Sequence, residues 1–317
     1  MKKLYKDDFL NTEIIKRIEK LERTPKIDKE IKPATTTSKA SKTSPINIKT
    51  IIMVILALIA ISRGYYLLVI ILFVFFIKLN NKNTDNGAYE DSPYANSVVL
   101  PILDEVFPGT KLCYNEGIDE EVYDRLFPRS EKYYSDCHIS FADEYNTEFS
   151  NLSAYHSRRS SKGKYIEIND FYGQVFLIKL KTNIKGHIRI VPLNNGNEDD
   201  EFFTPYGKRK ADEREIITES IYFNQAYNIF ATDEFYTKYI LDPSFIELLN
   251  DWSKKMKVCI YINENLIAVS FDSKTHLFTE PSTNTKLESI SLVDEYEKVR
   301  EKFGIFYEFI NIIREKV

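Results

Sequence analysis

The strongest pattern in the sequence is an apolar run from Ile51 to Ile77, in which Arg63 is the single charged residue. One helix over this run would be about 40 Å long, whereas the hydrocarbon core of a bilayer is about 30 Å thick. It would also place Arg63 near the bilayer centre, at a cost of about 2.5–3.5 kcal/mol. We therefore expect a transmembrane helical hairpin within residues 50–79. A single tilted span, a shallow re-entrant loop and a buried hairpin of a soluble protein are the alternatives.

In the hairpin, the turn would fall at Ser62-Arg63-Gly64. Glycine supplies the backbone freedom that a tight turn needs, and tyrosines are common at membrane interfaces. The predicted interface anchors are Lys49, Arg63, Tyr65, Tyr66 and Lys78.

Lysines flank the apolar run on both sides, and only Arg63 opposes them. Positively charged flanks stay on the cytoplasmic side of a membrane. This pattern predicts a multi-pass membrane protein with both termini in the cytoplasm and the lipid bilayer as its first partner.

Before the run, apolar residues recur every three or four positions between Asp8 and Arg23, which predicts an amphipathic helix within residues 1–30. Its apolar stripe could dock on its own protein, on the membrane surface or on a second copy, which would make a homo-oligomer. Residues 31–49 lack such periodicity and are typical of a flexible linker, and residues 80–97 are polar and predict a second tether.

Residues 98–317 alternate between strand and helix patterns. Runs of β-branched and aromatic residues predict strands at Asp136–Asp143, Thr147–His156, Tyr165–Asn169, Gln174–Leu180 and His187–Val191. The last three of these are predicted to form an antiparallel meander. A further hairpin is predicted from Lys257–Ile262 and Leu266–Phe271. Helices are predicted at Val98–Phe107, at Asp119–Phe127, after the capping residue Asp242 and after the capping residue Ser291. We therefore expect a cytoplasmic α+β domain with a mainly antiparallel sheet and packed helices.

Composition narrows the possible partners. The formal net charge of −4 argues against a general nucleic-acid-binding protein, which would be strongly basic. The three cysteines are odd in number and widely spaced, so they predict neither a disulfide framework nor a zinc site. We expect no metal and no cofactor.

No common catalytic motif occurs in the sequence. Patterns of the Rossmann, P-loop, H-E-x-x-H and G-x-S-x-G types are absent. Cys137 and His138 are adjacent, but neighbours on a strand point to opposite faces. The other histidines, His156, His187 and His276, stand alone, so no catalytic residue is predicted.

Asp233 has the sequence context of a helix N-cap or turn residue. The rival hypothesis is a membrane-tethered enzyme with an unfamiliar site, in which Asp233, His187 or Cys259 would line a deep pocket.

The basic loop formed by Arg158, Arg159, Lys162 and Lys164 is the best candidate for a contact site. Close to an anionic leaflet, each of these residues could contribute about 1 kcal/mol of attraction. The loop could therefore bind lipid head groups or a partner, or it could simply be a solvated loop.

Three stretches resemble one family. The first, Asp170–Leu180 (DFYGQVFLIKL), is a strand with an F-x-G step after an acidic residue. The second, Tyr227–Trp252 (YNIFATDEFYTKYILDPSFIELLNDW), has a strand, a Thr-Asp step and the start of a helix. The third, His276–Pro281 (HLFTEP), has an apolar residue, Phe, an acidic residue and Pro in that order. Over roughly Asp104–Ile313, and in its upstream layout, the chain resembles the bacterial membrane-anchored domain-of-unknown-function family 3137. Asp242 replaces the expected threonine and keeps its capping chemistry. The resemblance implies the fold, a bacterial source and an integral membrane location, but no activity, substrate or catalytic residue.

These observations favour a non-enzymatic, membrane-anchored protein whose cytoplasmic domain binds a protein partner or the membrane surface. The alternatives are the membrane-tethered enzyme and a sensor of anionic lipid head groups.

Overall fold

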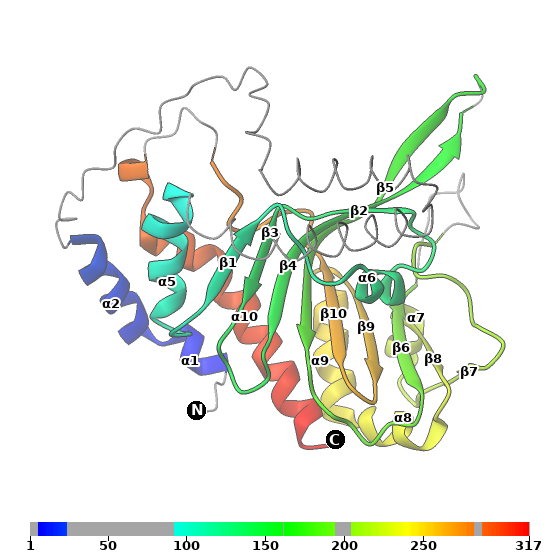
Figure 1. The fold of residues 1–317 in the computed structure, drawn as a ribbon. Helices are drawn as coiled ribbons and strands as arrows, with labels where there is room; N and C mark the ends of the chain where they lie inside the picture. Colours follow the sequence, from blue (N-terminus) through cyan, green and yellow to red (C-terminus); the bar gives the residue numbers. More distant parts are fainter. Residues whose placement is uncertain (1–5, 24–91, 161, 194–203, 282–286, 317) are drawn as a thin grey trace, which may run out of the picture. The chain divides into compact units, whose positions relative to one another are not determined.

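A ten-stranded sheet forms the centre of the computed structural model (Figure 1). The structure describes residues 6–23, 92–160, 162–193, 204–281 and 287–316. Within these ranges, no helix combines the length and the apolar character needed to cross a bilayer. The predicted hairpin at residues 50–79 and its anchors, Lys49, Arg63, Tyr65, Tyr66 and Lys78, lie outside the described residues, as do the linker at 31–49 and most of the tether at 80–97.

The sheet has the strand order β1-β3-β4-β5-β10-β9-β6-β8-β7, and β2 pairs with β4 beside this path. Every pairing is antiparallel, which confirms the predicted sheet type. The strands are β1 (Lys111–Tyr114), β2 (Lys132–Tyr134), β3 (Cys137–Ser140), β4 (Glu148–Arg159), β5 (Tyr165–Ile178), β6 (His187–Pro192), β7 (Arg214–Glu215), β8 (Tyr227–Ala231), β9 (Lys257–Asn263) and β10 (Ile267–Asp272).

Helices cover both faces of the sheet, and several start where the sequence predicts. They are α1 (Lys6–Leu10), α2 (Thr12–Arg23), η1 (Ala95–Val99), α5 (Leu100–Asp104), α6 (Glu120–Leu126), α7 (Ile221–Ala226), α8 (Glu234–Ile240), α9 (Pro243–Ser253), η3 (Leu287–Ser289) and α10 (Leu292–Arg314). Asp242 caps α9 by accepting a hydrogen bond from Phe245 N, and Ser291 caps α10 by accepting one from Asp294 N. Both predicted caps are confirmed.

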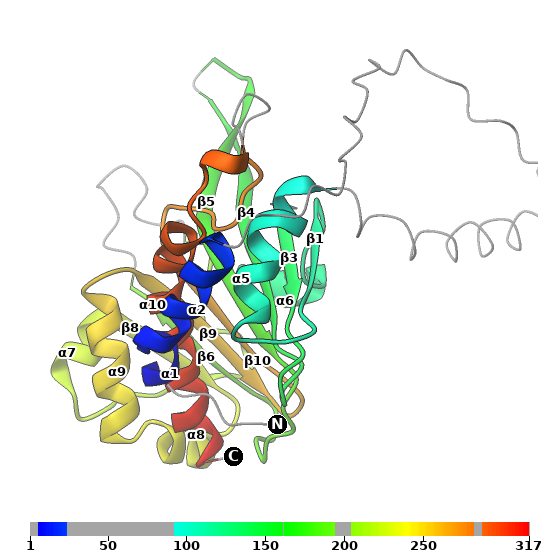
Figure 2. The same cartoon turned by 90° about the vertical axis from the view of Figure 1, so that its left-hand side faces the viewer.

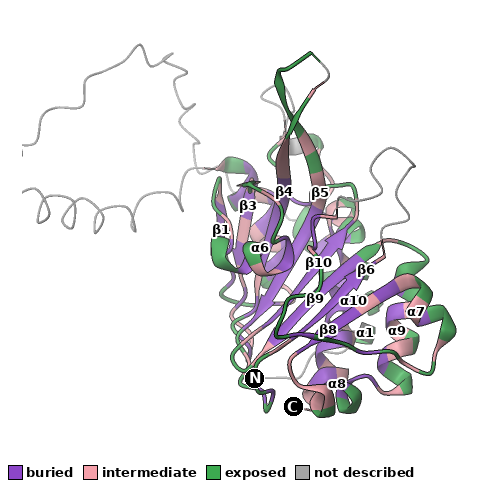
Figure 3. Ribbon diagram, turned by 90° about the vertical axis from the view of Figure 1, so that its right-hand side faces the viewer, coloured by how far each residue is buried: buried purple, intermediate pink, exposed green. Residues whose placement is uncertain are grey.

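The central strands are buried on both faces (Figure 3). In β5, Phe176 and Ile178 belong to the core beneath α10, whereas Val175 and Leu177 belong to a second core that contains α6 residues. This alternation follows from the period of two in a strand. The resulting fold is α+β, as predicted.

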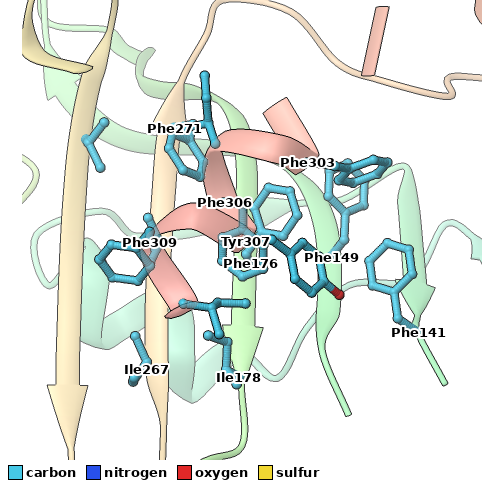
Figure 4. Close-up of a cluster of buried hydrophobic side chains, with 14 of the residues drawn as sticks. Phe141, Phe149, Phe176, Ile178, Ile267, Phe271, Phe303, Phe306, Tyr307 and Phe309 are labelled. Carbon is cyan, nitrogen blue, oxygen red and sulfur yellow. The ribbon is translucent and has the colours of Figure 1, made fainter. Parts of the chain in front are cut away.

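Aromatic side chains of α10 fill the larger core (Figure 4). Phe306 stacks on Phe176 with ring centroids 4.0 Å apart. Phe303 is 1% exposed and has six aromatic neighbours within 6.4 Å between ring centroids, namely Phe9, Phe107, Phe141, Phe149, Phe176 and Phe278. These neighbours come from segments far apart in the sequence, so Phe303 joins the helices to the sheet.

The predicted meander is wrong in its strand neighbours. Gln174–Leu180 does not pair with His187–Val191, because β10 and β9 lie between β5 and β6. The predicted strands Tyr165–Asn169 and Gln174–Leu180 are also one continuous strand, β5. Gly173 lies inside it rather than at a break, because its missing side chain lets β10 approach: a Cβ there would meet the Phe271 carbonyl oxygen at 2.0 Å.

Replacing Gly173 with alanine should therefore push β10 away from β5. We expect the free energy of unfolding to fall by about 1–3 kcal/mol, the usual cost of overpacking, as measured by urea denaturation. Asn169→Ala, at an exposed position of the same strand outside the β10 pairing, is the matched control and should change it by less than about 0.5 kcal/mol. Equal stability of the two variants would contradict this explanation of the strand order.

The predicted N-terminal amphipathic helix docks on its own chain (Figure 2). It is interrupted at Asn11, whose side chain accepts a hydrogen bond from Glu13 N and starts α2. Phe9 is fully buried, with its ring 5.1 Å from that of Tyr307, and its carbonyl oxygen accepts a hydrogen bond from Tyr296 Oη. Ile14 and Ile18 are also buried. Residues 6–23 are thus part of the same folded unit as residues 92–316.

The described residues on either side of segment 24–91 both contact the start of α10. Ser291 Oγ lies 3.5 Å from Glu22 Oε2, and Tyr94 Oη lies 3.2 Å from Glu295 Oε2. Residues 291 and 295 are about one helical turn apart. The chain therefore leaves and re-enters the described unit at one corner.

Candidate functional site

Beyond the sheet, β4 and β5 continue as a two-stranded ribbon, here called the arm, formed by residues 155–160 and 162–169. The pairing of β2 with β4 ends at Tyr155, and that of β10 with β5 ends at Gln174. Residues 156–159 pair only with residues 165–168, so at about 3.3 Å per residue the arm projects by roughly 13 Å. Figures 1 and 3 show it extending away from the rest of the fold.

A tight turn closes the arm. Ser160 N donates a hydrogen bond to the Lys164 carbonyl oxygen over 2.7 Å, and Gly163 N donates one to the Ser160 carbonyl oxygen over 2.9 Å. Gly163 has a φ of 78°, a backbone conformation that glycine adopts without strain. These two hydrogen bonds join the described residues on either side of position 161.

Acidic side chains at the base of the arm are engaged in internal contacts. A β-bulge between Ala154 and Tyr155 leaves Asp170 as the extra residue, and its carboxylate lies 2.5 Å from His156 Nδ1 and accepts a hydrogen bond from Ser130 Oγ over 2.8 Å. Burial raises the pKa of Asp170. Glu167 forms an ion pair with Lys132. These contacts stabilise the base of the arm.

The end of the arm is basic and partly apolar. The predicted residues Arg158, Arg159, Lys162 and Lys164 are all exposed there. Tyr165 is 76% exposed and Ile166 is 47% exposed. Within the described ranges, no carboxylate is within ion-pair distance of Arg159, Lys162 or Lys164. The sequence predicted the four basic residues as a loop but missed the two exposed apolar neighbours.

Each of the four histidines lies beside a carboxylate. The nitrogen-to-oxygen distances are 3.0 Å for His138 to Glu148, 2.5 Å for His156 to Asp170, 2.7 Å for His187 to Glu213 and 3.0 Å for His276 to Asp136. The partners are 10 to 140 residues apart in the sequence, so no local spacing could reveal them. His156, His187 and His276, which stand alone in the sequence, are thus each brought beside an acidic residue by the fold.

An acid, a histidine and a serine, the residue types of a hydrolase triad, meet at Asp136, His276 and Ser153. Their contacts have the geometry of a structural cluster rather than of a catalytic triad. Ser153 Oγ is 3.5 Å from His276 Nε2, while the Leu152 carbonyl oxygen is closer to the same nitrogen, at 3.3 Å. His276 also stacks on Tyr172, with ring centroids 4.0 Å apart. A cavity of about 340 Å³ is lined by His276 but not by Ser153. The set therefore holds the segment after β10 against the sheet.

The rival enzyme hypothesis named three residues, and each of them has its own place in the fold, apart from the other two. Asp233 caps α8 by accepting a hydrogen bond from Tyr236 N over 3.1 Å, which confirms its predicted N-cap role. Cys259 is buried, and burial raises its pKa to about 12. His187 lies opposite Asn263 in the β6–β9 pairing, four positions from Cys259 and so about 13 Å along the strand. These side chains do not form one reactive site.

Cys137 and His138 separate as predicted, with Cys137 in the core and His138 beside Glu148. In the described part of the chain, no group of three or more His, Cys, Asp or Glu side chains could hold a metal ion.

A buried ion pair fixes the segment after β6. Arg189 is 2% exposed and binds both carboxylate oxygens of Glu213, over 2.7 and 2.8 Å. Glu213 also accepts a hydrogen bond from Lys210 N over 2.7 Å, and Arg189 donates one to the Tyr206 carbonyl oxygen. Burial alone would raise the pKa of Glu213, but its hydrogen bonds, above all from Arg189, lower that pKa to about 2. The pair thus attaches residues 206–213 to the sheet.

Comparisons with known proteins add a family match. Residues 169–315 match the model of a family described as "Protein of unknown function (DUF3137)", which supports the expected resemblance over that range. No curated protein matches the chain. Among solved structures, the crystal structure of the mycobacterial trehalose monomycolate transport factor A, TtfA, is similar at 9% identity and a TM-score of 0.32, covering 64% of this chain and 88% of that chain.

Proposed function

We propose that this chain is a non-enzymatic, membrane-anchored binding protein. In this proposal, residues 6–23 and 92–316 form one cytoplasmic body, and the apolar run Ile51–Ile77 enters and leaves the inner membrane of a bacterium on the cytoplasmic side. The lysines on both flanks of the run support the cytoplasmic orientation.

One observation carries the proposal. Helices α1 and α2 precede the apolar run in the sequence and the whole sheet follows it, yet both parts share one core. Two segments packed in one core lie on the same side of a membrane. If the run is inserted in a bilayer, it must therefore cross an even number of times or not at all, which favours the hairpin over a single tilted span.

The points where the chain leaves and re-enters the body also favour the hairpin. Glu22 and Tyr94 both contact the first turns of α10, so segment 24–91 begins and ends at one corner of the body. A membrane hairpin needs its two ends close together on one side, and this corner meets that requirement.

Binding is favoured over catalysis because the candidate reactive side chains have structural roles. Asp233 caps a helix, His187 contacts Glu213 and Cys259 is buried with a raised pKa. In contrast, Arg159, Lys162 and Lys164 at the end of the arm are exposed to solvent, where a partner could contact them.

Cysteine labelling of the full chain in its native membrane tests the proposal. The native cysteines Cys113, Cys137 and Cys259 are buried, so they add little background. Lys16→Cys and Lys254→Cys replace side chains that are 65% and 72% exposed, before and after the apolar run. We expect a membrane-impermeant maleimide to label both in inverted vesicles and neither in intact spheroplasts, whereas Ser62→Cys should show the reverse.

Labelling of positions 16 and 254 from opposite sides would disprove the proposal that residues 6–23 and 92–316 form one cytoplasmic body. Release of the unmodified protein from membranes by alkaline carbonate would overturn the anchor.

A further inference from the structure

We propose that the arm is a docking element for an anionic bilayer surface, with Arg159, Lys162, Lys164 and Tyr165 as its principal contacts. This inference rests on the proposed membrane anchoring and identifies the surface that the tethered body binds.

The position of the arm supports a bilayer as the occupant. Figure 1 shows the arm projecting away from the C-terminal end of α10, with α2 and helix η1 on the other side of the sheet from the arm. The chain leaves the described unit after Arg23 and returns before Ser92, and the apolar run Ile51–Ile77 belongs to the segment in between. If the run is inserted, the predicted linker at 31–49 and the tether at 80–97 would keep the body, and with it the arm, within reach of the lipid surface.

The register of the arm explains how it would contact lipid. Arg158 is paired with Ile166, and Arg159 with Tyr165, so each face of the ribbon carries one basic and one apolar side chain near the turn. Lys162 and Lys164 lie in the turn itself. A ribbon with the same chemistry on both faces is suited to enter the head-group layer end-on, rather than to lie flat on one face.

The two kinds of side chain have separate roles at such a surface. Lysine and arginine are attracted to anionic head groups, and tyrosine favours the interface because its ring is apolar and its hydroxyl is polar. The nearby acids Glu167 and Asp170 contact Lys132 and His156, so they offset little of the positive charge at the end of the arm. The charge pattern therefore complements an anionic surface.

Fluorescence quenching in nanodiscs tests the proposal with the full chain. Tyr165→Trp places a reporter in the arm, and Tyr222→Trp, at a site on α7 that is 80% exposed, is the matched control. The native Trp252 is 3% exposed and gives a constant background. In discs of phosphatidylglycerol with brominated acyl chains, we expect strong quenching of the reporter at position 165 and none at position 222. In brominated phosphatidylcholine discs, quenching at position 165 should be much weaker.

Charge variants in the Tyr165→Trp background separate attraction from mere proximity. Lys162→Gln with Lys164→Gln should weaken docking by about 30-fold, because each lysine near an anionic surface supplies about a fivefold gain. Lys181→Gln with Lys185→Gln, at exposed positions in the connection between β5 and β6, removes the same charge elsewhere and should leave the quenching unchanged.

Three results would overturn the proposal. Equal quenching at position 165 in both lipids would exclude recognition of anionic lipid. No quenching in either lipid, with the protein held in the disc, would leave the arm to a protein partner while the anchor stands. Failure of the full chain to enter discs would overturn the anchor and the docking together.

Discussion

Replacing Phe303 with alanine is expected to lower the free energy of unfolding by about 3–5 kcal/mol, the largest effect of any single core truncation proposed for this protein. Phe303 is 1% exposed and lies among six aromatic rings, including Phe9 of α1 and Phe149 of β4. Its removal leaves a cavity at the junction of the N-terminal helices, α10 and the sheet, and these rigid elements can close it only in part.

Chemical denaturation monitored by far-ultraviolet circular dichroism would measure this loss. Phe235→Ala is the matched control, because Phe235 on α8 is 78% exposed and should change the free energy of unfolding by less than about 0.5 kcal/mol. A loss below about 1 kcal/mol for Phe303→Ala would show that this aromatic cluster does not join the layers as described.

Replacing Glu213 with glutamine is expected to cost about 3 kcal/mol of unfolding free energy at pH 7, because it leaves the buried Arg189 guanidinium without its counter-charge. The effect should depend on pH. The pKa of Glu213 is lowered from 4.5 to about 2 in the folded protein. A lowered pKa in the folded state gives stability that is complete above pH 4.5 and is lost as the pH falls towards 2.

Urea denaturation at several values between pH 7 and pH 3 would test this dependence. The difference in unfolding free energy between the wild-type protein and Glu213→Gln should be constant above about pH 5 and shrink below it. Glu215→Gln, at an exposed position on β7, is the matched control and should change the free energy of unfolding at pH 7 by less than about 0.5 kcal/mol. A difference between wild type and Glu213→Gln that persists unchanged to pH 3 would contradict the role of the ion pair.

Elements encoded by local signals could be predicted from the sequence. The caps Asp242 and Ser291 each bind a backbone N–H three residues later, so their spacing was visible in the chain. The apolar stripe of α10 was equally local, since it repeats with the period of a helix. Its predicted members are all buried, namely Leu292, Tyr296, Val299, Phe303, Phe306, Ile310 and Ile313. The α+β class followed from these elements together.

The strand order could not be predicted, because it depends on contacts between distant segments. β5 pairs with β10 about a hundred residues later, through an approach that only Gly173 permits. In the sequence, Gly173 lies between the predicted strands Tyr165–Asn169 and Gln174–Leu180, where a glycine is typical of a break. The buried pair of Arg189 and Glu213 could not be predicted either, since a charged residue normally predicts an exposed position.

The candidate site was predicted in its charge but not in its shape. Arg158, Arg159, Lys162 and Lys164 are close in sequence, so their gathering needed no tertiary information. How far the arm projects depends on where β2 and β10 stop pairing with β4 and β5. Those end points are set by distant segments, so the sequence could show a basic loop but not a projecting ribbon.

The docking of α1 on α10 also constrains how the protein is made. Phe9 emerges from the ribosome long before Phe303, its neighbour in the finished core, and the ring centroids of the two end only 6.3 Å apart. During synthesis, the early helix therefore lacks its binding site until α10 has emerged, near the end of translation. The core that contains Phe9 can be completed only after almost the whole chain has been made.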